Sequence, residues 1–101
     1  MADESASLHA ALAAAFGDDP ALMADLRRTF LQSAQAHVQA MVRSTTVPEW
    51  HRAAWRFKGL CTTFGIAQLT DLAERAAVGA KGDPGVLRRI ELALSRLSEE
   101  N

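Results

Sequence analysis

Few side chains in this sequence could take part in covalent or metal chemistry. The candidates are one cysteine and three histidines: Cys61, His9, His37 and His51. They are too scattered for zinc-ligand spacing, and no set of nucleophile, base and orienting group accompanies them. Cys61 also falls on the apolar side of its predicted helix, where a thiol acts as a packing residue. We therefore expect no metal, no cofactor, no catalytic residue and no enzymatic activity.

A tryptophan gives the clearest indication of function. The stretch from Trp50 to Gly65 has the periodicity of one amphipathic helix that ends at glycine. At 100° per residue, Trp55 falls roughly 160° from Phe57 and therefore points outward. The opposite side is predicted to be buried, because these residues all fall within about 60° of Phe57: Trp50, Ala53, Ala54, Leu60, Cys61 and Phe64.

The outward side of this helix is a candidate partner-binding surface. We call it the Trp55 face and define it by His51, Trp55, Lys58, Gly59 and Thr62. An exposed indole leaves apolar area that a partner would remove from water. Gly59 costs the helix about 1 kcal/mol relative to alanine, so its place at mid-helix favours close approach of another backbone. The alternative is a tolerated glycine beside a tryptophan that lies flat on its neighbours.

Helix start signals recur along the chain. Asp19-Pro20 and Asp83-Pro84 each place an acidic N-cap before a proline at the first helical position. Thr46 and Glu49 have the spacing of a capping box just before the central helix. Each signal is followed by apolar residues that recur every three or four positions, which is typical of amphipathic helices.

These patterns predict an all-α chain with no strand. We expect a short N-terminal lid helix over 5–16 and longer helices over 20–43, 50–65, 66–77 and 84–99. Long helices joined by short loops pack as an antiparallel up-and-down four-helix bundle. The length fits a single domain over 1–101.

Composition excludes several classes of function. A net charge of -1 and a pI near 6.3 provide no basic field, so we expect no nucleic-acid binding. No apolar run reaches the ~18 residues of a membrane span. The acidic start is unlike a secretory signal, and a lone thiol fits a reducing compartment, so we expect a cytoplasmic protein.

The charged groups of the last two helices are interpreted as solvated faces: Asp71, Glu74, Arg75, Arg88, Arg89 and Glu91.

The central stretch also carries a family resemblance. Trp55-Arg56-Phe57-Lys58-Gly59, with a second glycine at Gly65, resembles the motif His-x-Leu-Lys-Gly of histidine-containing phosphotransfer (HPt) domains in bacterial phosphorelays. The likeness covers roughly 19–97. It implies a four-helix bundle in two-component signalling whose partner is the receiver domain of a response regulator or a hybrid histidine kinase. It also implies that Lys58 sits near the phosphate and that Gly59 lets the receiver come close.

The chain departs from the family at the residue that carries the chemistry. Trp55 stands where the family has its phosphate-accepting histidine. Imidazole offers a nitrogen lone pair, whereas indole offers only an N–H donor, so tryptophan cannot accept a phosphoryl group. The resemblance therefore implies a pseudo-HPt module, regulatory or scaffolding, that binds its partner through the Trp55 face without accepting phosphate there.

Two alternatives remain open from the sequence. One is an active phosphotransfer protein that uses His51, although a one-turn offset of roughly 6 Å would spoil the in-line geometry of transfer. His37, at the edge of the long helix's apolar stripe, is interpreted as a boundary residue. The other alternative is a structural bundle that self-associates as a homodimer through the Trp55 face.

Overall fold

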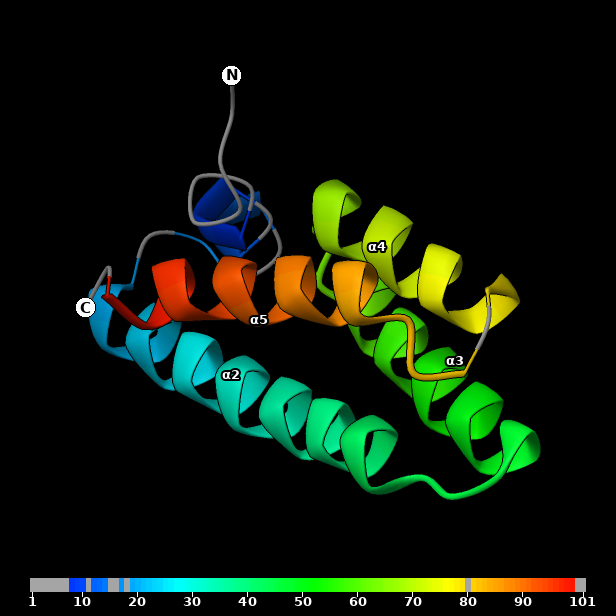
Figure 1. Cartoon of the computed structure of the whole chain (residues 1–101). Helices are drawn as coiled ribbons and strands as arrows, with labels where there is room; N and C mark the ends of the chain where they lie inside the picture. Colours follow the sequence, from blue (N-terminus) through cyan, green and yellow to red (C-terminus); the bar gives the residue numbers. More distant parts are fainter. Residues whose placement is uncertain (1–7, 11, 15–16, 18, 80, 100–101) are drawn as a thin grey trace.

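The computed structural model describes residues 8–10, 12–14, 17, 19–79 and 81–99. Its four long helices are α2 (Pro20–Arg43), α3 (Val47–Thr63), α4 (Ala67–Val78) and α5 (Pro84–Glu99) (Figure 1). They pack antiparallel, and the described residues contain no strand. The predicted fold class, an up-and-down four-helix bundle, is confirmed.

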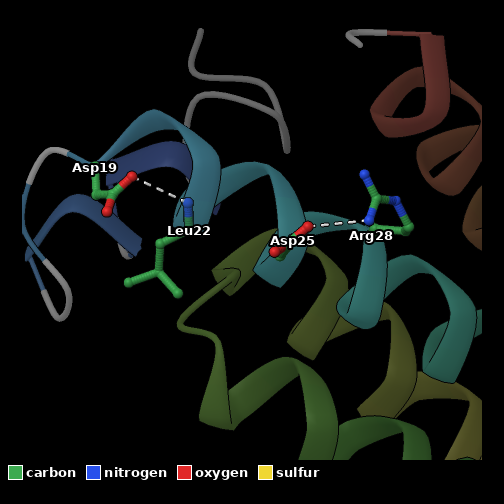
Figure 2. Close-up of polar contacts among 4 residues, drawn as sticks. All are labelled: Asp19, Leu22, Asp25 and Arg28. Carbon is green, nitrogen blue, oxygen red and sulfur yellow. Dashed lines mark hydrogen bonds and ion pairs between the residues drawn. The ribbon is translucent and has the colours of Figure 1, made fainter.

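The helices begin where their capping residues stand. The Asp19 carboxylate accepts a hydrogen bond from the Ala21 N–H at 3.0 Å. It also accepts one from the Leu22 N–H at 3.2 Å, which Figure 2 shows. Asp83 caps α5 in the same way, accepting from the N–H groups of Gly85 and Val86. These carboxylates satisfy amide groups that have no partner within the helix. The two Asp-Pro signals therefore set the first residues of α2 and α5.

The predicted capping box of α3 is also present. The Thr46 hydroxyl accepts from the Glu49 N–H at 3.2 Å, and the Glu49 carboxylate accepts from the hydroxyls of Thr45 and Thr46, both at 2.9 Å. These bonds favour the ionised carboxylate and lower the pKa of Glu49.

The turn from α3 into α4 depends on a glycine. Gly65 has φ +70°, a left-handed conformation that costs other residues energy. The Ile66 N–H donates to the Cys61 carbonyl and the Gly65 N–H to the Thr62 carbonyl, both at 3.1 Å, which is the bonding pattern of a Schellman motif. This turn reverses the chain so that α4 packs back against α3.

The helices form a closed ring around one core. α3 contacts α2 and α4, and α5 contacts α4 and closes on α2. The buried Trp50 Nε1–H donates to the Ala76 carbonyl at 2.8 Å and so ties α3 to α4. The largest fully buried side chains come from every long helix and from the N-terminal segment: Trp50, Phe30, Phe57, Leu8, Met41, Ile66, Leu69, Ile90 and Leu97.

The predicted lid lies only partly within the described residues. Residues 8–10 and 12–14 are helical, and the side chains of Leu8 and Leu12 are buried. Phe16, the last residue of the predicted lid, lies outside the described residues. The short N-terminal helix therefore covers the bundle with the two leucines that the structure describes.

The predicted buried side of the central helix needs one correction. Leu60 and Phe64 are only half-buried and pack at the edge of the core. Leu60 lies at the border of the apolar stripe. Phe64 is the C-cap residue that follows Thr63, the last residue of α3. Its ring packs at 5.0 Å from the ring of Phe30.

Candidate functional site

The two tryptophans of α3 have opposite environments. The side chain of Trp50 is fully buried, whereas Trp55 is 49% exposed. The helical wheel predicted this contrast, because five residues turn a helix by about 140°. Trp55 therefore presents half of a large apolar surface to solvent, on the side of α3 that faces away from the core.

A lysine lies against the exposed indole. The Lys58 Nζ is 4.5 Å from the centroid of the Trp55 ring, within the range of a cation–π interaction, which contributes about 0.5–1 kcal/mol at an exposed site. The two residues are three positions apart, a spacing that brings side chains together on one helix face. The site thus offers an aromatic plane with a positive charge above it.

Gly59 leaves open space next to this pair. It is exposed, and a Cβ built at Gly59 would meet no heavy atom within 4 Å. Within the described part of the chain, no contact therefore requires glycine here, although glycine lowers the stability of a helix interior. The missing side chain makes a place where a second backbone can come close to α3.

Thr62 ends the face at the last turn of α3. Its hydroxyl donates to the Lys58 carbonyl at 2.9 Å, and the neighbouring Thr63 hydroxyl donates to the Gly59 carbonyl at the same distance. Both hydroxyl protons are therefore used within the helix. Toward solvent, Thr62 presents its methyl group and the lone pairs of its oxygen, which can accept hydrogen bonds.

A shallow groove continues the face around the corner into α4. It has a volume of about 260 Å³, and Thr62 lines it together with Gly65, Ala67, Thr70 and Asp71. Gly65 was expected only as the helix end and the second glycine of the motif, Asp71 was expected only as part of a solvated face, and Ala67 and Thr70 carried no signal of a site. The groove forms only when the turn at Gly65 brings the start of α4 beside the end of α3.

The histidines do not converge on a reactive centre. His51 is half-buried on α3 and His9 is exposed. His37 is half-buried on α2, and its pKa is lowered by burial and then by the positive charge of Arg56. These surroundings favour the neutral form of His37, and its half-burial fits a place at the edge of the apolar stripe.

The cysteine is inert, as its position on the helix predicted. Cys61 is buried, and burial raises the pKa of its thiol to about 12. Only the thiolate is an effective nucleophile or metal ligand, so this side chain serves packing at neutral pH.

The described part of the chain has neither a candidate metal site nor a candidate membrane span. Its His, Cys, Asp and Glu side chains form no group of three or more that could hold a metal ion. None of its helices combines the length and apolarity needed to cross a membrane. Comparisons of the chain with protein-family models, with curated proteins and with solved structures returned no match.

Proposed function

We propose that this chain is a pseudo-HPt module that binds a receiver domain, or the receiver of a hybrid histidine kinase, through the Trp55 face. The observation that carries the proposal is the exposure of Trp55 on the outward side of α3, with Lys58 over its ring and Gly59 beside it. A four-helix bundle supports the resemblance to the phosphotransfer family.

The surface has the composition of a binding hot spot. A tryptophan side chain buries about 150–250 Å² when it is fully covered. Since Trp55 is 49% exposed, a partner would remove about 100 Å² from water, which is worth about 2.5 kcal/mol at 25 cal/mol per Å². Tryptophan is among the residues that dominate interface energies. Trp55 alone therefore supplies a substantial part of a micromolar interaction.

Binding through this surface would not transfer phosphate at Trp55. The indole nitrogen has no free lone pair to attack an aspartyl phosphate. A module that binds the receiver without accepting its phosphoryl group competes with the active phosphotransfer partner for the receiver. The proposed role is accordingly competitive or scaffolding control of a phosphorelay.

Calorimetric titration tests the proposal. Candidate receiver domains are titrated into the wild type, Trp55→Ala and a matched control, Val78→Ala, which alters an exposed apolar residue at the end of α4. We expect the Trp55→Ala affinity to fall by about tenfold or more, in line with loss of a hot-spot residue, and the control to bind as the wild type does. No binding by the wild type, or equal binding by Trp55→Ala, would remove the proposal.

A phosphate-transfer assay separates this function from an active relay through His51. The chain is incubated with a phosphorylated receiver and then examined for acid-labile label. We expect no label on the wild type, because His51 is half-buried and one turn away from the motif position. Label that disappears in His51→Ala would establish the relay instead.

A further inference from the structure

A second surface lies between α4 and α5. The two helices border a groove with a volume of about 660 Å³. From α5 it is lined by Arg89, Leu92, Ala93 and Arg96, at the spacings of three, four and seven that define one helix face. α4 contributes Gln68, Asp71, Leu72 and Arg75, which have the same spacings counted from Gln68. The groove therefore runs along both helices for about two turns.

Three arginines give this groove a positive charge. Arg75, Arg89 and Arg96 line it with Asp71 as the one acidic side chain. Among the described side chains, none forms an ion pair with these arginines, and the recorded pair, Arg28 with Asp25, lies on α2. The concentration of cations is local, since the whole chain has a net charge of -1.

Helix electrostatics explain only part of this charge. Arg75 and Arg96 lie in the last turns of α4 and α5, where a cation is favoured by the helix dipole. Arg89 lies in the first half of α5 and gains nothing from the dipole. Its charge is therefore available to an anionic partner in the groove.

The groove also has an apolar centre. Leu92 is 50% exposed between Arg89 and Arg96, and Leu72 is half-buried across from it on α4. A small anion would use the arginines and leave this apolar surface in water. A ligand with both carboxylates and apolar side chains fits the whole groove.

We propose that the α4–α5 groove binds an acidic amphipathic helix of a partner protein. Apolar residues of that helix pack on Leu92 and Leu72, and flanking Asp or Glu side chains pair with the arginines. Guanidinium groups suit this role because they bind carboxylates in bidentate fashion. The inference does not depend on the function of the Trp55 face, although Asp71 lines both this groove and the groove at the α3–α4 corner.

The test uses a designed probe. A fluorescein-labelled helical peptide of about 14 residues, roughly 21 Å long, carries leucines on one face and glutamates on both sides of it. A second peptide has lysine in place of each glutamate. Fluorescence anisotropy measures the affinity of the full chain for each. We expect the glutamate peptide to bind and the lysine peptide to fail, with binding weaker as salt rises because exposed ion pairs are screened.

Two adjacent arginines provide matched variants. Arg89→Gln removes a cation from the groove, whereas Arg88→Gln removes one from the same helix outside it. We expect Arg89→Gln to weaken binding by up to about fivefold, the effect of one exposed ion pair, and Arg88→Gln to weaken it by less than about twofold. Leu92→Gln tests the apolar centre and should also weaken binding.

Three results would overturn the inference. The first is no binding of the glutamate peptide up to about 1 mM, the limit of weak association. The second is an equal effect of Arg88→Gln and Arg89→Gln, which would mean nonspecific attraction. The third is a dimer in sedimentation that dissociates in Arg89→Gln, which would assign the groove to a second copy of the chain. None of these experiments includes a receiver domain, so their failure is distinct from failure of the proposed function.

Discussion

Gly59→Ala should make this protein more stable. The residue lies well inside α3, and a Cβ at Gly59 would meet no heavy atom of the described residues around it within 4 Å. Alanine loses less backbone entropy on folding than glycine, so the substitution should raise the free energy of unfolding by about 0.5–1 kcal/mol. For a domain of this size that corresponds to a rise in Tm of about 2–8 °C, measurable by circular dichroism.

Gly79→Ala is the matched control for this prediction. A Cβ at Gly79, just after α4, would lie 2.7 Å from the Arg75 carbonyl oxygen, and a backbone atom cannot move aside cheaply. The same chemical change should therefore destabilise the fold here, by about 1–3 kcal/mol. If Gly59→Ala lowers the Tm, or if both variants shift it in the same direction, the argument from open space at Gly59 is refuted.

The larger variant Gly59→Leu connects stability with binding. Leucine is a good helix former, and its side chain would extend into the open space beside Trp55. We expect a Tm no lower than that of the wild type together with loss of affinity for the receiver domain. Unchanged affinity would mean that no backbone approaches α3 at this point, and the reason offered for the glycine would be wrong.

Three further predictions concern the core, the pH dependence and the motif position. Trp50→Phe removes the indole N–H that donates to the Ala76 carbonyl, so the free energy of unfolding measured in urea should fall by about 1–3 kcal/mol. The pKa of His37 in the folded state lies below its ordinary value. The unfolded state therefore binds more protons, and the free energy of unfolding should decline as pH falls below about 6.5. Urea titrations across that pH range should show a smaller decline for His37→Gln. Trp55→His restores a nitrogen lone pair at the motif position and should acquire acid-labile label from a phosphorylated receiver. Absence of label would mean that the rest of the site cannot support phosphoryl transfer.

The helices were predictable from the sequence because their ends are encoded locally. Asp19, Thr46 and Asp83 each bond to amide groups two or three residues ahead, so the signal and its effect lie within one turn. The direction of Trp55 was predictable for a similar reason, since it follows from the helical period alone.

Features that depend on packing between helices could not be predicted in this way. Arg75 and Arg89 were interpreted as parts of two separate solvated faces, and only the contact of α4 with α5 brings them to one groove. The surroundings of the half-buried Phe64 depend on Phe30 of another helix. Such arrangements follow from three-dimensional contacts that neither segment encodes by itself.

The different surroundings of the two indoles also provide a built-in spectroscopic probe. The chain has two tryptophans and no tyrosine, so its near-ultraviolet emission comes almost wholly from these rings. Trp50 sits in an apolar interior and Trp55 in water, so a soluble quencher should reach the second and spare the first. Emission from Trp55→Phe would then report unfolding alone, and emission from Trp50→Phe would report events at the molecular surface, without any attached dye.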